Sequence, residues 1–372
     1  MAGRIESLRV KGFRSLRDIH LPLDHVAVYR GANGTGKTNI YRALEFCQRA
    51  AAGDLSLWLA RQGGLSSAMW AGGARKHEKA RIEISATVGD LRYHIEVGHP
   101  RPTDAAFPGE PLIKEETVEH LSGKRIYPLM KRRGPSVEFE GSDGKKHHLD
   151  DFLLPSETAL SRIATSDAAP EVVELRETML QWRFFHAFRT DPQSPLRFPF
   201  PAVTATRLDP DGGNIAAVLA TLEHIRQDTA DIRRIVSEAF DGASLVIPIP
   251  EGQASFSVVW QDLPFRQFTQ QELSDGTLQF VALCAALLSY HLPRLVVLNE
   301  PENSLHPSLM PALARLVGIA AENSQVIIVT HSQELATALE EQLAVQVRSV
   351  EKQEGETQLA GLTLLGTFKD TD

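Results

Sequence analysis

The chain has few of the features that mark a specialised class of protein. Only two cysteines, Cys47 and Cys284, occur in 372 residues, and both fall in apolar helical patterns where cysteine behaves as a small hydrophobic side chain. We therefore expect neither a disulfide framework nor a zinc site. No stretch approaches the roughly 20 apolar residues of a membrane span, and the N-terminus lacks the apolar core of a signal peptide. These features predict a cytoplasmic protein without a membrane partner.

Positive charge is not in excess either. The sequence has 39 lysines and arginines against 47 acidic residues, a formal net charge of −8. Because nucleic-acid-binding domains are usually basic, any contact with DNA must come from local patches. With 42% hydrophobic residues the chain can fill a sizeable core, and its length suits one large domain or two.

A phosphate-binding loop is the strongest motif. Residues 31–38, Gly-Ala-Asn-Gly-Thr-Gly-Lys-Thr, match the pattern G-x-x-x-x-G-K-S/T. The apolar run 26–29 before them predicts a buried strand, and the spacing after them predicts an amphipathic helix. Such a loop lets backbone N–H groups approach phosphates at a helix N-terminus. A plain strand-to-helix turn needs neither Lys37 nor Thr38, so nucleotide binding is favoured, with Lys37 on the phosphates and Thr38 on Mg²⁺.

The remaining chain alternates strand-like and helical patterns. Residues 4–23 predict two strands, and residues 81–148 predict an antiparallel β lobe. We expect a connecting segment with one short helix at 53–79 and helical spacing at 156–186 and 213–240. A proline-rich surface link is expected at 191–210, and a final βαβαβ order in the last third. The βαβαβ order implies a mostly parallel sheet.

Three further segments carry polar residues at places suited to anion or water chemistry. Ser274 and Gly276 lie at the start of an apolar helix, although ordinary capping explains a serine there equally well. Glu300 ends an apolar strand and is placed to activate a water molecule as general base, the alternative being a solvated strand end. His331 ends another buried strand, where a histidine is by itself more often structural.

In this order the motifs resemble those of ABC-type ATPases. Residues 31–38 match Walker A, 273–277 a variant signature, 299–300 Walker B, and His331 the switch histidine. The opening 8–16 and the loop 33–39 resemble the RecF/SMC branch, and the resemblance covers roughly the first 50 and last 100 residues. No long heptad run is present, so a short-armed, RecF-like ATPase without a long coiled coil is implied.

The resemblance implies an α/β P-loop NTPase of ABC-ATPase type. Its core would be a mixed or parallel sheet carrying an inserted antiparallel β lobe and a helical lobe. The first section of the core, with Walker A, is expected at residues 1–55, and a connecting segment with the β lobe at 56–155. The helical lobe is expected at 156–240, and the second section of the core at 241–372.

The resemblance also implies ATP and Mg²⁺ as ligands and a homodimer that sandwiches ATP between Walker A of one subunit and the signature of the other. Catalytic roles fall on Glu300, His331 and Lys37, and metal binding on Thr38 and Asn299. Nucleotide binding falls on Asn33, Gly34, Thr35, Gly36, Lys37, Thr38, Asn39, Arg14, Ser274 and Gly276.

Two departures from the family pattern stand out. Asn299 replaces the usual Walker B aspartate, which removes one negative charge near the metal and predicts slow hydrolysis. The signature reads Leu-Ser-Asp-Gly-Thr rather than Leu-Ser-Gly-Gly-Gln. Gln181 is a candidate for the glutamine that links the metal to conformational change, with plain helix surface as the alternative.

RecF/SMC relatives act on DNA in repair, and basic clusters at 124–125, 131–133 and 145–148 would be the DNA contacts, or else solvated hairpins. An alternative is a slowly hydrolysing ATP switch that recruits a separately encoded effector, such as a nuclease in repair or phage defence. A nucleotide-binding subunit of a membrane transporter is disfavoured by the opening motif and the β lobe.

Overall fold

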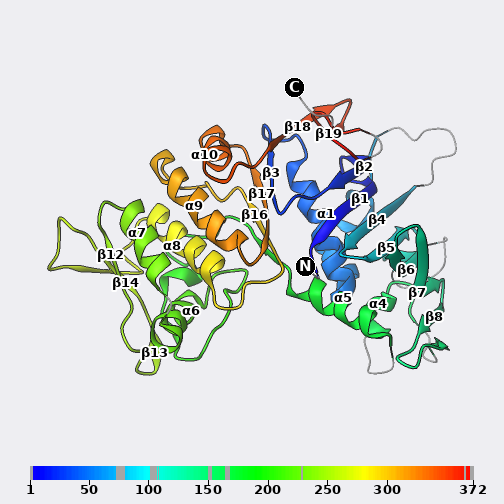
Figure 1. The fold of residues 1–372 in the computed structure, drawn as a ribbon, viewed down its shortest axis with the longest axis horizontal. Helices are drawn as coiled ribbons and strands as arrows, with labels where there is room; N and C mark the ends of the chain where they lie inside the picture. Colours follow the sequence, from blue (N-terminus) through cyan, green and yellow to red (C-terminus); the bar gives the residue numbers. More distant parts are fainter. Residues whose placement is uncertain are drawn as a thin grey trace. The chain divides into compact units, whose positions relative to one another are not determined.

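The computed structural model describes residues 3–72, 80–100, 107, 109–149, 153–163, 168–227, 229–363 and 366–368. The chain divides into two compact units, each assembled from segments distant in sequence (Figure 1). Unit 1 contains residues 1–24, 31–182 and 348–372, and unit 2 contains residues 25–30 and 183–347. The division into four sequence ranges stays a prediction.

An eight-stranded antiparallel sheet dominates unit 1, in the order β2-β1-β4-β5-β6-β7-β8-β9 (Figure 1). The strands are β1 (Ile5–Phe13), β2 (Leu16–Pro22), β4 (Arg81–Val88), β5 (Leu91–Gly98), β6 (Leu112–Ser122), β7 (Arg125–Arg133), β8 (Ser136–Glu140) and β9 (Lys146–His148). Burial alternates along β4 and β5, since successive side chains of a strand point to opposite faces. The predicted antiparallel β lobe is confirmed, and it includes the two N-terminal strands.

Helices cover the apolar face of this sheet. Helix α1 (Lys37–Ala52) contacts β1 and β4, and α4 (Ala159–Ile163) and α5 (Pro170–Gln181) contact α1. Burial on α1 includes the predicted apolar positions Ile40, Ala43, Leu44 and Cys47 and extends around the helix at residues 43–47, because neighbouring helices cover it as well as the sheet. Sheet and helices therefore enclose one hydrophobic core in unit 1.

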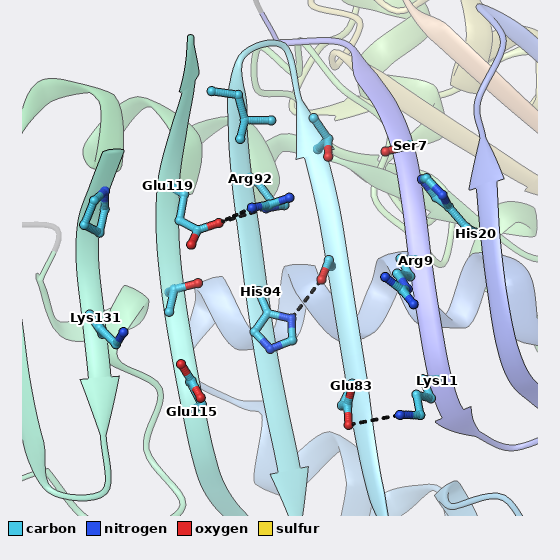
Figure 2. Close-up of a pocket in the computed structure, with 15 residues that line it drawn as sticks. Ser7, Arg9, Lys11, His20, Glu83, Arg92, His94, Glu115, Glu119 and Lys131 are labelled. Carbon is cyan, nitrogen blue, oxygen red and sulfur yellow. Dashed lines mark hydrogen bonds and ion pairs between the residues drawn. The ribbon is translucent and has the colours of Figure 1, made fainter. Parts of the chain in front are cut away.

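The opposite face of the sheet is polar and forms a hollow of about 650 Å³ (Figure 2). Charges on this face pair across neighbouring strands: Arg92 lies 2.6 Å from Glu119, and Lys11 lies 3.7 Å from Glu83. Burial lowers the pKa of His94, which keeps that ring neutral at pH 7. Most of the cations on this face are therefore balanced by a neighbouring carboxylate.

Arg132 is fully buried although it lies in the basic run 131–133. Its guanidinium donates hydrogen bonds to the carbonyl oxygens of Gly134, Glu157 and Leu154. A DNA contact by Arg132 is therefore excluded, which corrects that part of the sequence-based prediction. The side chain instead attaches the segment before α4 to the β lobe.

Glu116 is the second fully buried charged group of this region. Its carboxylate accepts hydrogen bonds from the backbone N–H groups of Ala159 at 2.6 Å and Leu160 at 3.0 Å, and from Tyr93 Oη at 3.0 Å. Burial raises its pKa, while these hydrogen bonds and the charge of Arg132 act in the opposite direction. The charge of Arg132 is thus one of several interactions that favour the ionised carboxylate of Glu116.

We predict that Arg132→Met lowers the free energy of unfolding by about 3 kcal/mol, because the carbonyl oxygens of Gly134, Glu157 and Leu154 lose their donor and each buried unsatisfied polar group costs about 1–3 kcal/mol. Arg133→Met is the matched control, because Arg133 is the next residue in the chain and is exposed. This variant should change the free energy of unfolding by less than about 0.5 kcal/mol. Urea unfolding of both variants measures the difference. Equal effects would contradict the structural role of Arg132.

Unit 2 is built on four parallel strands in the order β10-β16-β17-β3. They are β3 (Val26–Arg30), β10 (Arg183–Phe185), β16 (Leu295–Asn299) and β17 (Gln325–Thr330), and the helices α8 (Asp275–Leu288), α9 (Met310–Ala321) and α10 (Gln333–Leu343) accompany them (Figure 1). Every residue of β17 is buried, as in a parallel sheet covered on both faces. The predicted mostly parallel core is confirmed.

Smaller elements complete unit 2. Two helices, α6 (Ile215–Ala220) and α7 (Ala230–Ala239), pack on α8, and a π-helical turn η2 (Thr221–Arg226) follows α6. Short antiparallel sheets join β11 (Phe200–Pro201) to β13 (Gln253–Ala254), and β12 (Ser244–Val246) to β14 (Ser257–Val259) and β15 (Gln267–Thr269). Within the described ranges the longest helix is α1, with 16 residues, so that part of the chain contains no long coiled coil.

Some sequence-based boundaries are wrong. The helix expected to reach residue 186 ends at Gln181, because the apolar residues that follow form β10 against β16. The helix expected over 213–240 is interrupted at Gln227, whose φ is 54°. The segment 53–79 contains two short helices, α2 (Leu55–Arg61) and α3 (Gly64–Ala68), rather than one.

Candidate functional site

The phosphate-binding loop, residues 31–36, belongs to unit 1 and begins directly after β3. Gly36 is the N-cap of α1 with a φ of 92°, and among the described residues no side chain caps this helix end. The first turn, Lys37 to Ile40, carries no acidic residue. The N-terminal N–H groups and the positive end of the helix dipole are thus available to an anion.

The three glycines of the loop are required for different reasons. A Cβ on Gly36 would lie 1.9 Å from Thr357 Oγ1, and a Cβ on Gly31 would lie 2.4 Å from the Val350 carbonyl oxygen. Both neighbours belong to the hairpin of β18 (Val347–Gln353) and β19 (Glu356–Leu359). Gly34 has a φ of 82° and, within the described part of the chain, open space around its Cβ position, so the backbone is most accessible to a ligand there.

The lysine of the motif is buried inside the loop. Lys37 Nζ donates hydrogen bonds to the carbonyl oxygens of Gly31 at 2.6 Å and Ala32 at 2.8 Å. Thr357 Oγ1 donates to the Thr35 carbonyl at 2.8 Å, which ties the loop to β19. The loop thus surrounds the ammonium group of Lys37, and a positive charge at a helix N-terminus favours an anionic phosphate group.

Asn39 and Arg14 lie beside the loop through Ser15. Asn39 Nδ2 donates to Ser15 Oγ at 2.7 Å, and Ser15 Oγ lies 2.6 Å from Thr357 Oγ1. Asn39, which was predicted to bind nucleotide, therefore uses its side-chain amide to position Ser15, the residue next to Arg14. Its direct contact with nucleotide stays a prediction.

Arg14 has a partner that the sequence did not reveal, Arg42 of α1. Both guanidinium groups donate a hydrogen bond to Gln62 Oε1, and the bond from Arg14 is 3.1 Å long. Burial lowers the pKa of Arg14, and the neighbouring charge of Arg42 lowers it further. In the described structure the Nε atoms of both arginines are buried without a hydrogen-bond partner. Two cations that share a neutral amide favour an anionic ligand.

In unit 2, polar groups gather where β16 and β17 end. The two strands are parallel with Asn299 opposite Val329, so their carboxyl ends share one edge of the sheet. Glu300 follows with a φ of 49°, and its N–H donates to the Val329 carbonyl at 2.7 Å. A positive φ in a non-glycine residue is strained, and such strain concentrates at functional sites.

The structure brings Glu300 and His331 together. His331 Nδ1 lies 3.6 Å from Glu300 Oε1 and 3.1 Å from Glu302 Oε1. Glu302 is 7% exposed, and its position next to the histidine was not apparent from the sequence. Asn299 Oδ1 is buried and has no hydrogen-bond partner among the described residues. The cluster therefore joins a carboxylate, a histidine ring and an unsatisfied amide oxygen.

The signature segment starts α8 in unit 2. Ser274 is its N-cap and accepts a hydrogen bond from the Thr277 N–H at 3.2 Å. A Cβ on Gly276 would lie 2.7 Å from the Ser304 carbonyl oxygen. N-capping therefore accounts for Ser274, and close packing accounts for Gly276. The contact of both residues with phosphate stays a prediction.

Arg197, from the proline-rich link, anchors this segment and was missed by the sequence analysis. Its guanidinium donates to the carbonyl oxygens of Gln271 at 3.0 Å and Leu273 at 2.8 Å, and to Asp275 Oδ1 at 2.6 Å. Arg197 is 9% exposed. It neutralises the aspartate that stands where the family signature has glycine.

We predict that Arg197→Met lowers the free energy of unfolding by about 2–3 kcal/mol, because the carbonyl oxygens of Gln271 and Leu273 lose their donor and a buried unsatisfied polar group costs about 1–3 kcal/mol. Arg189→Met is the matched control: Arg189 is exposed and pairs with Asp191 at the surface, where ion pairs contribute at most about 1 kcal/mol. Urea unfolding compares the two variants. A smaller loss for Arg197→Met than for Arg189→Met would be incompatible with an anchoring role.

Comparison with protein families identifies residues 30–337 with the family described as "AAA domain, putative AbiEii toxin, Type IV TA system". The chain belongs to this AAA family. Comparison with curated protein sequences gives no match. The matched residues include Walker A from its first glycine, the signature, Glu300 and His331.

Solved structures similar to this AAA protein are heads of SMC proteins. An Smc head domain from Pyrococcus furiosus, with an extended coiled coil and bound to the C-terminal domain of ScpA, has a TM-score of 0.51 at 14% identity, covering 97% of each chain. The SMC head domain from Thermotoga maritima has a TM-score of 0.45 at 15% identity, covering 96% of this chain and 98% of that one. The Pyrococcus likeness concerns the fold. Fold and family together confirm the resemblance to SMC/RecF-like ABC-type ATPases.

Three further observations complete the site. Gln181 is the last residue of α5 in unit 1, and its predicted role is still a prediction. Among the described residues, no group of three or more His, Cys, Asp and Glu side chains is arranged to hold a metal ion. None of the described helices is both long and apolar enough to cross a membrane.

Proposed function

We propose that this AAA protein binds ATP and Mg²⁺ on residues 31–38 and hydrolyses ATP with Glu300 as general base. The observation that carries the proposal is the contact of His331 with Glu300 at the shared end of β16 and β17. Strand β3 lies beside β17 in the same sheet and continues directly into the loop.

The residues present fit a nucleotide with its metal. The capless start of α1, the accessible backbone at Gly34 and the paired cations Arg14 and Arg42 all suit phosphate oxygens. We assign Asn33, Thr35, Gly36 and Lys37 to the phosphates, and Thr38 and Asn299 to Mg²⁺. When bound, Mg²⁺ would supply positive charge that offsets the negative charge of the phosphates.

The side chains at the end of β16 and β17 would divide the work of hydrolysis. Glu300 is 26% exposed at its side chain, so water reaches it, and its carboxylate accepts the proton of the attacking water. His331 is 41% exposed and binds the terminal phosphate through the ring nitrogen that does not face the carboxylates. The strained backbone at Glu300 holds the base in one orientation.

Asn299 in place of aspartate makes hydrolysis slow. Two unit charges about 4 Å apart interact by roughly 4 kcal/mol at an effective dielectric constant near 20, before desolvation, so the loss of the aspartate charge weakens metal binding. Asn299 Oδ1, which has no hydrogen-bond partner among the described residues, would still accept a hydrogen bond from a water molecule near the metal. Nucleotide binding thus survives while turnover is low.

Asn299→Asp restores that charge, and we expect it to raise both Mg²⁺ affinity and steady-state turnover by at least about tenfold, which corresponds to 1.4 kcal/mol. Turnover measured across a Mg²⁺ titration tests this. Asn323→Asp, an exposed position after α9, is the control for added charge alone. Unchanged Mg²⁺ dependence and rate in Asn299→Asp would refute this role of the residue.

We further propose that ATP closes a homodimer. Each chain has one phosphate loop and one signature, and Ser274 and Gly276 would face the phosphates held by the other subunit. Cytoplasmic action on double-stranded DNA in repair or defence follows from the family resemblance. The exposed basic residues of the predicted clusters are Lys124, Arg125, Arg133 and the hairpin 145–148, in which Lys145 already pairs with Asp143 and Lys146 with Glu138.

Glu300→Gln should trap the closed state, because ATP binds but is not hydrolysed. Size-exclusion chromatography with light scattering is expected to give a dimer for this variant with ATP and a monomer without it. Lys37→Ala should stay monomeric with ATP, and Glu341→Gln, exposed at the end of α10, should behave as wild type. A monomer for Glu300→Gln under saturating ATP would disprove the sandwich.

The same experiment with duplex DNA separates the two functional proposals. Co-elution of DNA with the ATP-bound dimer at low salt, lost as salt is raised, supports direct DNA binding. A dimer that excludes DNA favours the alternative, an ATP switch that recruits a separately encoded effector. The self-neutralised polar face of the β lobe in Figure 2 is a specific observation in favour of that alternative.

A further inference from the structure

Glu302 is a buried carboxylate that binds the turn after β17. Its Oε1 accepts hydrogen bonds from Thr330 Oγ1 at 2.6 Å, from the His331 N–H at 3.0 Å and from the Ser332 N–H at 3.2 Å. Burying a carboxylate is costly unless such hydrogen bonds replace water, and hydrogen bonds to a charged acceptor are the strong ones. The turn that carries His331 is therefore held by Glu302.

The same oxygen also lies beside the histidine ring, with His331 Nδ1 3.1 Å from Glu302 Oε1. A carboxylate oxygen only accepts hydrogen bonds, so this proximity favours a ring that carries its hydrogen on Nδ1. Nε2 is then the nitrogen left for a ligand. Carboxylates that hold a histidine by one nitrogen set the behaviour of the other nitrogen in this way.

Glu302 and Glu300 contribute differently to this arrangement. Glu300 Oε1 is 3.6 Å from Nδ1, and the Glu300 side chain is 26% exposed, whereas that of Glu302 is 6% exposed. The exposed carboxylate is accessible to water and to a reacting group. The buried one accepts hydrogen bonds from the turn through Oε1, while its Oε2 has no hydrogen-bond partner among the described residues.

We propose that Glu302 is a positioning residue that acts through His331. It fixes the tautomer and the direction of the ring, while Glu300 and His331 contact the reacting groups. The proposal rests on the proposed ATPase function for its effect on rate, but the ring contact itself exists without nucleotide. The two parts are therefore testable separately.

The kinetic test is a double-mutant cycle between Glu302 and His331. Glu302→Ala should lower kcat by about tenfold to a hundredfold, the scale of a misplaced catalytic group, with ATP affinity within about twofold of wild type. Glu302→Gln keeps an acceptor oxygen for the turn and should recover most of the lost rate. In a His331→Ala background, Glu302→Ala should change kcat by less than about twofold. Independent, multiplicative effects would overturn the proposal.

Glu334→Gln is the matched control. Glu334 is an exposed carboxylate on the same turn that accepts from Ser332 Oγ at 2.8 Å, and its substitution should leave kcat unchanged. Thermal melting accompanies each variant. If Glu302→Ala does not fold, Glu302→Gln is the test variant. A wild-type kcat in Glu302→Gln, together with hydrogen on Nδ1 of His331, supports the proposal. A loss of kcat equal to that of His331→Ala, with the His331 tautomer unchanged, overturns it.

The second readout is independent of turnover. Ring ¹⁵N NMR of His331 in the nucleotide-free protein, assigned by comparison with His331→Ala, should show hydrogen on Nδ1 in wild type and a shift toward the Nε2 tautomer in Glu302→Ala. A wild-type ring without hydrogen on Nδ1 would exclude the proposed contact. If wild type hydrolyses no ATP, the proposed function fails, and this spectrum alone still decides whether Glu302 positions the ring.

Discussion

The parallel pairing of β3, β17 and β16 is the constraint on which the rest of this structure depends. Parallel strands end at a common edge, so residues that follow them in distant parts of the sequence arrive together. In unit 2 this places Glu300 and Glu302 next to His331. It also sets where the phosphate loop starts, because the loop is the direct continuation of β3. The chemistry of the protein is thus organised by strand order.

Buried charged side chains fix the loops that this arrangement leaves irregular. Arg132 and Arg197 each bind several backbone carbonyl oxygens, and Glu302 binds N–H groups of the turn after β17. A planar guanidinium offers five donors in a rigid fork, so one side chain can satisfy a whole loop. The polar groups of these loops are satisfied without regular secondary structure.

The β lobe separates a helix-covered face from a polar one. On the polar face Lys11 and Arg92 each have a carboxylate neighbour (Figure 2). On the opposite face the guanidinium of Arg132 binds backbone carbonyl oxygens. The exposed residues Lys124, Arg125 and Arg133 lie at the turns on either side of β7, whereas Lys146 on β9 already pairs with Glu138. Clusters of basic letters in a sequence therefore overstate the charge available to a partner, because pairing and burial remove part of it.

The sequence by itself determined the phosphate loop, the strand before it, the helix after it, the antiparallel lobe and the parallel core. These depend on local patterns, namely glycine spacing, alternation and apolar runs. Only the tertiary structure decided that Arg42 accompanies Arg14, that Arg197 holds the signature and that Glu302 holds His331. Each of these contacts joins residues far apart in the chain, and a charged residue that folding will bury reads in sequence like any solvated one. Burial and partner choice are properties of the packed fold, and a local pattern does not contain them.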